Sequence, residues 1–412
     1  MSTADFDKKL RDYAHLAVHV GVGLRSGQRL IVRAPVEAAP LVRQIAECAY
    51  KAGARLVEVL WTDDELTLAR FRHAPRDSFE EFPTWRARAQ LEAVDARDAL
   101  LVVYGADPDL LEGQDPALVS LVTKVNQQQM APVSRRISND DTNWCVLGVP
   151  VTGWAAKVFP NEPESARVEK LWEAIFRVCR IDQPDPEGAW RKHLGQLAER
   201  GGHMTKKQFK ALHYTAPGTD LTVGLPERHT WRSGLTTTPS GIAFTANIPT
   251  EEIWSMPHKD RVEGTVTGTK PLSHGGVLID KIQLTFAAGR VVEARASSGE
   301  EVLRQLVATD EGSSRLGEVA LVPHGSMVSK TGVLFYDTLY DENASCHFAL
   351  GRAYRNCVEN GQTMDDLQFA AAGGNSSLAH VDFMIGSAEL NIEGVRHDGK
   401  KEPVMRAGEW AF

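Results

Sequence analysis

The sequence predicts an α/β N-terminal domain with a mostly parallel sheet, followed by an α+β C-terminal domain with mostly antiparallel strands. In the first half, short apolar runs alternate with helical patterns, as expected when helical crossovers join parallel strands. Beyond about residue 205, short segments of alternating apolar and polar residues dominate instead. The length of 412 residues suits two or three domains. We therefore expect an N-terminal domain at 1–204 and a C-terminal domain at 205–412.

The elements of the N-terminal half follow from their periodicity. Apolar residues recur at helical spacing over 5–20, and an alanine-rich helix is expected over 36–54. Buried strands are predicted at 29–35, 55–61, 98–108 and 143–151. Two amphipathic helices, at 163–181 and 185–201, lead into the second half.

The elements of the C-terminal half are mainly strands. They are predicted at 209–216, 219–226, 261–269, 277–297 and 381–394. Within them, residues 289–296 begin with glycine and alternate in polarity, which predicts the return strand of a hairpin. Two helical patterns, at 299–310 and 342–356, interrupt the strands.

Charge and composition exclude several classes of protein. There are 54 acidic against 46 basic residues, giving a net charge of −8, which argues against a nucleic-acid partner. The cysteines form no CxxC pair, which excludes a zinc ribbon and a dense disulfide scaffold; they are Cys48, Cys145, Cys179, Cys346 and Cys357. No segment has the form of a signal peptide or a membrane span. We expect a cytoplasmic protein with reduced thiols and no membrane partner.

The sequence does not support the common nucleotide-binding and catalytic motifs. GVGLRSG at 21–27 has Ser26 at the third glycine position and precedes the first strand, whereas a dinucleotide loop must follow one. The phosphate-binding GxxxxGK[ST], the GxSxG nucleophile elbow and the HExxH zinc motif do not occur.

Candidate ligands gather in the second half. His380 and Asp382 are two residues apart in an apolar strand, so their side chains point to the same face. They are either a histidine hydrogen-bonded to an acid or two metal ligands. Asp341, Glu342 and His347 lie where we expect a helix to start, so the acids could cap it. A buried histidine there needs a partner, for which a metal is one option.

Further acids extend this set. Glu251 and Glu252 are adjacent and point in different directions, so strand geometry lets at most one join a shared site. Glu318 stands in an apolar strand, where a carboxylate is rarely buried without a partner. Together these residues form a plausible two-metal constellation, in which carboxylates bridge the ions.

Several long segments resemble a known family. They are TDLTVGLPERHTW, NIPTEEIW, RVEGTV, TDEGSSRLGEVALVP, LFYDTLYDENASCHFALGRAY and HVDFMIGS. They are similar to the thermophilic metalloaminopeptidases, metallopeptidase family twenty-nine, which comprises aminopeptidases T, S and II. The resemblance covers the second half closely, and the first half agrees in layout.

The resemblance implies a set of site residues. Matched motif by motif, the metal ligands are Glu252, Glu318, Glu342, His347, His380 and Asp382, which would hold two divalent ions per subunit (Zn, Co, Mn or Mg). Tyr354 matches a tyrosine implicated in catalysis. The seven residues from His347 to Tyr354 would put both on one face of the expected helix, with Glu342 at its non-helical start.

The resemblance also implies a function. It is that of a metalloaminopeptidase, which removes the N-terminal residue from short peptides and works as a homodimer. Glu318 would bridge the ions or act as general base, and Tyr354 would donate a hydrogen bond to the oxyanion. The alternative is an iron-dependent ring-cleaving dioxygenase of the dihydroxypyridine type on the same fold. Such an iron site needs only two histidines and one carboxylate, so the larger acidic set favours the peptidase. A non-enzymatic protein, such as a peptide-binding or scaffold protein, would not need six metal-ligand residues.

Overall fold

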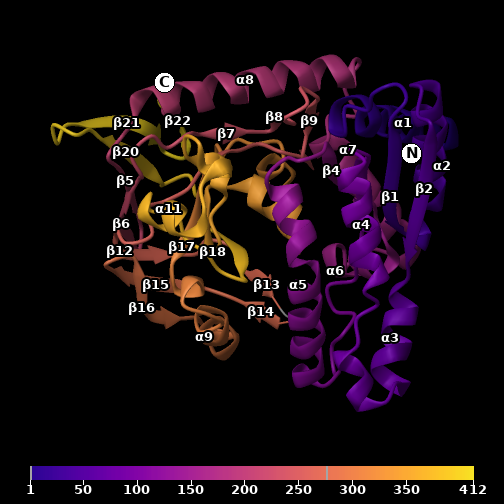
Figure 1. Ribbon diagram of the computed structural model, residues 1–412, viewed down its shortest axis with the longest axis horizontal. Helices are drawn as coiled ribbons and strands as arrows, with labels where there is room; N and C mark the ends of the chain where they lie inside the picture. The colour runs from indigo at the N-terminus through magenta and orange to yellow at the C-terminus, as the bar shows by residue number, and fades with distance from the viewer. Residues whose placement is uncertain (1, 275–276) are drawn as a thin grey trace. The chain divides into compact units, whose positions relative to one another are not determined.

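The computed structural model describes residues 2–274 and 277–412, which pack into two compact units (Figure 1). The first unit comprises Met1–Leu194 and Leu235–Thr250, and the second comprises Gly195–Gly234 and Glu251–Phe412. The division falls inside helix α8 (Pro186–Lys207). These units differ from the expected ranges 1–204 and 205–412 at that boundary and in the segment 235–250, which pairs with the first unit's sheet.

The first unit is built on a five-stranded parallel sheet, as the alternation of strands and helices predicts. Its order is β10-β4-β3-β1-β2, and every adjacent pair is parallel. The strands are β1 (Arg29–Pro35), β2 (Leu56–Thr62), β3 (Ala99–Tyr104), β4 (Trp144–Gly148) and β10 (Asn247–Ile248). The short strands β8 (Leu235–Thr237) and β9 (Ala243–Thr245) form a separate antiparallel pair.

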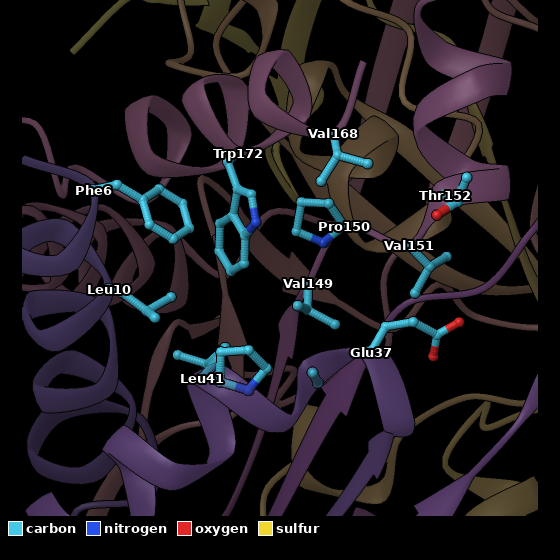
Figure 2. Close-up of a pocket in the computed structure, with 12 residues that line it drawn as sticks. Phe6, Leu10, Glu37, Leu41, Val149, Pro150, Val151, Thr152, Val168 and Trp172 are labelled. Atoms are coloured by element: carbon cyan, nitrogen blue, oxygen red, sulfur yellow. The ribbon is translucent and has the colours of Figure 1, made fainter. Parts of the chain in front are cut away.

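Helices precede, connect and follow these strands, and those expected over 5–20, 36–54 and 163–181 are present. They are α1 (Thr3–Leu16), the π-helical turn η1 (Ala17–Gly21), η2 (Val36–Ala38), α2 (Ala39–Lys51), α3 (Asp64–His73), η3 (Arg76–Glu80), α4 (Trp85–Asp95), α5 (Pro116–Ser138), α6 (Thr152–Val158) and α7 (Glu164–Val178). Figure 2 shows a hollow of about 180 Å³ in this unit, where Phe6, Leu10 and Trp172 face Val149 and Pro150. Its lining is almost wholly apolar. No helix in the described ranges is long and apolar enough to cross a membrane.

The second unit contains two larger antiparallel sheets, which confirms the predicted change of fold class. Their orders are β16-β15-β12-β6-β5-β20-β21-β22 and β19-β18-β17-β11-β7. The strands of the first are β5 (Ala211–Ala216), β6 (Thr219–Gly224), β12 (Val262–Thr267), β15 (Gln283–Ala287), β16 (Arg290–Arg295), β20 (Asn391–Val395), β21 (Lys401–Arg406) and β22 (Glu409–Trp410). Those of the second are β7 (Arg232–Ser233), β11 (Ile253–Ser255), β17 (Leu316–Leu321), β18 (His347–Gly351) and β19 (His380–Met384).

Short elements complete the second unit. They are the hairpin β13 (Leu272–His274) and β14 (Val277–Ile279), and the helices α9 (Glu300–Val307), η4 (Gly312–Ser314), η5 (Ser329–Thr331), α10 (Thr338–Asp341), η6 (Glu342–Ala344), η7 (Arg355–Cys357), η8 (Gly361–Thr363) and α11 (Asp366–Ala371). The hairpin expected at 289–296 is present, with β15 pairing with β16.

The helix expected over 342–356 is wrong. The 3₁₀ turn η6 leads into strand β18, which lies between β17 and β19 and is buried along its whole length. Alanine and leucine favour a helix locally, but a strand inside a sheet satisfies its backbone on both sides. Here the tertiary pairing overrides the local pattern.

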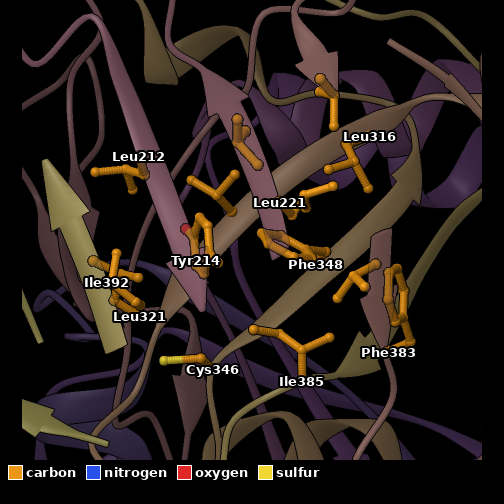
Figure 3. Close-up of a cluster of buried hydrophobic side chains, with 14 of the residues drawn as sticks. Leu212, Tyr214, Leu221, Leu316, Leu321, Cys346, Phe348, Phe383, Ile385 and Ile392 are labelled. Carbon is orange, nitrogen blue, oxygen red and sulfur yellow. The ribbon is translucent and has the colours of Figure 1, made fainter. Parts of the chain in front are cut away.

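The core of the second unit contains side chains from both large sheets. Figure 3 shows Leu212, Tyr214 and Leu221 of the eight-stranded sheet among Phe348 and Phe383 of the five-stranded one. The rings of Tyr214 and Phe348 meet edge to face, with centroids 5.0 Å apart. One face of the five-stranded sheet therefore packs in the hydrophobic core. The side chains on its other face do not belong to this core.

Replacing Tyr214 with Phe tests this packing. The Tyr214 hydroxyl is buried, and no described residue offers it a hydrogen bond. Because an unsatisfied buried hydroxyl costs about 1–3 kcal/mol, Tyr214→Phe should raise the free energy of unfolding by about 1 kcal/mol. Urea unfolding at equilibrium measures the change. A loss of stability in this variant would show that the hydroxyl is satisfied in solution.

Candidate metal centre

The second face of the five-stranded sheet carries the predicted ligands. On β18 and β19, Phe348 and Phe383 point into the core, so their neighbours His347 and Asp382 point to the opposite face. His380, two residues before Asp382, shares that face. On β17, Glu318 precedes the core residue Val319, and Glu252 immediately precedes Ile253 on β11. Because successive side chains of a strand point to opposite faces, the core residues lie on one face of the sheet and the predicted ligands on the other.

A bulge in β17 puts Glu318 on this face. Leu316 and Val319 both lie in the core although they are three residues apart, because the register shifts between Leu316 and Glu318. The extra residue is Gly317. A Cβ atom there would lie 2.3 Å from the carbonyl oxygen of Gly351 and 2.4 Å from that of Arg352, so only glycine fits. The glycine of the LGEVALVP motif thus determines where the glutamate points.

The strand register leaves room in the centre of the site. Glu318 lies opposite Ala349 on β18, which in turn lies opposite Asp382 on β19. Two strand spacings separate the backbones of the two acids by roughly 10 Å. The only side chain in this row between them is the methyl group of Ala349, which is fully buried. The two carboxylates can therefore reach toward the same space above the sheet.

The ligand atoms face one another at short range. The Nε2 atom of His347 lies 3.1 Å from Oε2 of Glu252 and 3.6 Å from Oε1 of Glu318. On the other side, Nε2 of His380 lies 3.6 Å from Oε2 of Glu318 and 3.7 Å from Oδ1 of Asp382. The two oxygens of Glu318 thus face two different histidines. This is the placement that a bridging carboxylate requires.

Two overlapping groups of side chains have the dimensions of a metal site. Glu252, Glu318 and His347 form one, and Glu342, His347 and Asp382 form the other, with the ligand atoms of each group within 4.8 Å of one another. His380 joins the same cluster through Glu318 and Asp382. The structure therefore brings all six predicted ligands together.

Backbone carbonyls orient both histidines. The Nδ1 atom of His347 lies 3.2 Å from the carbonyl oxygen of Ser345, and that of His380 lies 2.7 Å from the carbonyl oxygen of Arg352. Since a carbonyl can only accept, each Nδ1 donates. Both Nε2 atoms then face the carboxylates and could ligate a metal ion there, which is the usual arrangement of metal-binding histidines.

Glu342 reaches the site from a turn, not from the start of a helix as predicted. It is the first residue of η6, and the segment continues into β18 without a helix. The next residue, Asn343, is fully buried; its Oδ1 accepts a hydrogen bond from the backbone N–H of Glu251, and its Nδ2 donates one to the carbonyl of Leu339. Asn343 therefore fastens this turn to the segment that carries Glu252.

The centre concentrates negative charge in a buried place. Its four carboxylate residues are only 5% to 9% exposed, and His347 is 1% exposed. Burial first, and then the charges of Asp382 and Glu252, raise the pKa of the Glu342 carboxyl well above its usual value. Burial also raises the pKa of Glu318, although the hydrogen bond with His347 opposes this. Burial would lower the pKa of His347, but its contacts with Glu252 and Glu318 prevail and raise it.

These residues fit divalent metal ions. Oε2 of Glu252 and Oδ1 of Asp382 are buried and accept no hydrogen bond from any described residue. Buried carboxylates are stable only when paired or bound to a cation, and the only ion-pair partners that the described residues give these acids are the two histidines. Carboxylate oxygens and imidazole nitrogens suit zinc and similar ions.

Tyr354 lies beside the cluster, but not for the reason that the spacing suggested. It follows β18 in the loop before η7, so no helix face joins it to His347. Instead its ring packs against that of His380, with centroids 4.8 Å apart. Burial and then the charge of Glu318 raise the pKa of its hydroxyl well above the usual value, so the group is a neutral donor.

Sequence reasoning missed the residues that position the ligands. Ala349 and Gly317 act through cross-strand register, which a single sequence does not reveal. Asn343 lies inside the DENASCH motif, close to predicted ligands. Its amide side chain could therefore have been recognised from the sequence as a positioning residue. The contacts of the Ser345 and Arg352 carbonyls could not be predicted from the sequence, because they are backbone groups that every residue has.

Filling the space above Ala349 tests this geometry. Ala349→Leu would place a larger side chain between Glu318 and Asp382, so we expect bound metal and activity to fall at least about tenfold while the protein stays folded. Metal analysis, activity and circular dichroism measure the three properties. Ala349→Gly is the matched control and should keep its metal. Full metal occupancy in the leucine variant would place the ions elsewhere.

Comparison with known proteins shows the family of the chain. Residues 6–410 match the family model described as thermophilic metalloprotease (M29). Aminopeptidase 2 of Geobacillus stearothermophilus is 49% identical over 407 residues, covering 99% of this chain and 98% of the relative. The solved structure of AmpT from Thermus thermophilus superposes with a TM-score of 0.93 at 43% identity, covering 99% of this chain and all of that one.

A more distant structure shares the fold alone. The 2,5-dihydroxypyridine dioxygenase of Pseudomonas putida gives a TM-score of 0.50 at 13% identity, over the whole of this chain and 98% of that one. Because the family model spans nearly all of the sequence and the relatives match it from end to end, the chain belongs to the thermophilic metalloprotease (M29) family.

Proposed function

We propose that this protein is an aminopeptidase that removes the N-terminal residue from short peptides at a centre of two divalent ions. The observation that carries the proposal is the position of Glu318, whose two oxygens each lie 3.6 Å from the Nε2 atom of a different histidine. The printed names of the relatives, aminopeptidase 2 and aminopeptidase T among them, support the exopeptidase activity.

Six side chains would hold the ions. Glu252 and His347 lie on one side of Glu318, and His380 and Asp382 lie on the other, with Glu342 near His347 and Asp382. The oxygen and nitrogen donors suit Zn, Co, Mn or Mg, with the histidines favouring the first two. When bound, such ions lower the pKa of water toward neutrality and polarise the carbonyl of the scissile peptide.

The residues of the chain supply the rest of the reaction. Tyr354 would donate a hydrogen bond from its neutral hydroxyl to the oxygen that gains charge at the scissile carbonyl, a contribution of about 3–4 kcal/mol in comparable sites. Glu318 would accept a proton from the attacking water and pass it to the leaving amine. Ligation and proton transfer compete for the same carboxylate, so Glu318 alternates between the two roles in this scheme.

The ring-cleaving dioxygenase remains the second candidate because the Pseudomonas putida enzyme shares the fold. A mononuclear iron site takes two histidines and one carboxylate and keeps open positions for oxygen. Here four carboxylates surround the two histidines, and two of them carry buried oxygens without a hydrogen bond from the described residues. This surplus of acids favours two ions and peptide hydrolysis. We also propose a homodimer, as the family resemblance implies, and a cytoplasmic protein with reduced thiols, as the cysteine pattern suggests.

Glu318→Gln tests the proton-transfer role. We expect the rate of leucine-amide hydrolysis to fall about 10²–10⁴-fold, because the amide cannot accept a proton. Metal content is measured on the same sample, so that loss of ions and loss of the base are distinguished. Glu251→Gln is the control: its side chain is outside both ligand groups, and its rate should stay near that of the wild type. Normal turnover by a metal-loaded Glu318→Gln enzyme would remove Glu318 from the mechanism.

A blocked substrate tests the exopeptidase assignment. Leucine amide and its N-acetyl derivative differ only at the α-amine, so a site that binds the free amine should cleave the first and leave the second intact. Liquid chromatography of the products measures both rates. Equal cleavage of the two would indicate an endopeptidase or amidase, and ring cleavage of a dihydroxypyridine with one Fe(II) per subunit would favour the dioxygenase.

A further inference from the structure

A second group of metal-ligating side chains lies in the first unit. It consists of His15, His19 and Cys48, whose ligand atoms lie within 4.8 Å of one another. None of the three belongs to the catalytic centre described above. The group combines two imidazoles with a thiol, whereas the catalytic centre has only oxygen and nitrogen donors.

The end of α1 brings the two histidines together. His15 lies in the last turn of α1, and His19 lies four residues later in the π-helical turn η1. Their rings lie against each other in a tilted arrangement, with centroids 4.2 Å apart and an interplanar angle of 35°. π-helical turns are rare and often occur at functional sites. Helices α1 and α2 lie side by side (Figure 1), and Cys48 reaches the pair from the C-terminal part of α2.

A carboxylate completes the set. Oε2 of Glu187, at the start of α8, lies 2.8 Å from Nε2 of His15. The other oxygen, Oε1, accepts two hydrogen bonds from Arg191. Glu187 can therefore bind a metal ion directly or orient His15 as an outer partner, the role that carboxylates commonly play beside metal-binding histidines.

The group is accessible to a metal ion from solvent. Both histidines are partly exposed, and His15 and Glu187 line a surface hollow of about 310 Å³. Cys48 is half-buried beside them.

We propose that His15, His19 and Cys48 bind one transition-metal ion, of the zinc or cobalt(II) class, with Glu187 as the fourth ligand or the outer partner of His15. Two nitrogens and one sulfur select such ions over Mg²⁺ or Ca²⁺, which prefer oxygen. On binding, the Cys48 S–H bond breaks, its proton goes to solvent, and a metal–sulfur bond forms. The bound ion would link α1 to α2, and its binding would not depend on the catalytic centre.

Cobalt(II) gives a direct test, because a cobalt–thiolate bond absorbs in the near ultraviolet. The six proposed catalytic ligands include no sulfur, and the other four cysteines are buried. Titration of the reduced, metal-free full-length protein with Co²⁺ should therefore produce this band from one thiolate-bound ion per subunit, besides the cobalt that the catalytic centre binds. Cys48→Ser should abolish the band, lower the bound cobalt by one ion per subunit, and leave leucine-amide hydrolysis unchanged.

Histidine variants give the matched comparison. His19→Ala should weaken the binding that produces the band by more than the roughly 10–100-fold that the loss of an outer partner costs. His73→Ala, which removes an exposed histidine at the end of α3, should bind cobalt as the wild type does. Glu318→Gln should keep the band, which separates this site from the catalytic one. No thiolate band with excess Co²⁺, or a band that survives Cys48→Ser, would overturn the proposal.

Discussion

The structure of the second unit depends on the burial of four carboxylates around two imidazoles on one face of a sheet. Taking an ion from water into a protein costs several kcal/mol after relaxation, and two histidines cannot compensate four acids. The raised pKa values of Glu318 and Glu342 express this imbalance. Divalent cations bound as we propose would remove this imbalance, because the charges that oppose folding without metal would then serve as ligands.

The sheet supports this arrangement through the alternation of its strands. Phe348 and Phe383 hold β18 and β19 against the core, and this fixes the opposite direction for His347 and Asp382. The bulge at Gly317 aligns Glu318 with them, and Ala349 keeps the centre open. Every ligand except Glu342 lies on a strand of this sheet or immediately before one. A rigid sheet can hold several ligands at fixed distances better than loops can.

Much of the fold could be predicted from the sequence where patterns are local. The strand expected at 29–35 is β1, and the change from parallel to antiparallel sheets is present. The helix expected over 342–356 is absent because β18 owes its conformation to β17 and β19, which lie far away in the chain. The proposed ligands could be named although this element was wrong, because motif resemblance gives residue identity and does not depend on geometry. The positioning roles of Ala349, Gly317 and Asn343 required the cross-strand register and the loop contacts. The cysteines form no metal-binding motif in the sequence, yet the fold brings one of them beside two histidines.

The position of Glu318 between two ions can be tested directly. A crystal of the cobalt-loaded protein, measured at wavelengths on both sides of the cobalt absorption edge, locates the ions without reference to activity. We expect two anomalous peaks roughly 3.5–4 Å apart, one on each side of the Glu318 carboxylate. A single peak at this centre, or two peaks that do not share Glu318, would show that Glu318 does not bridge two ions.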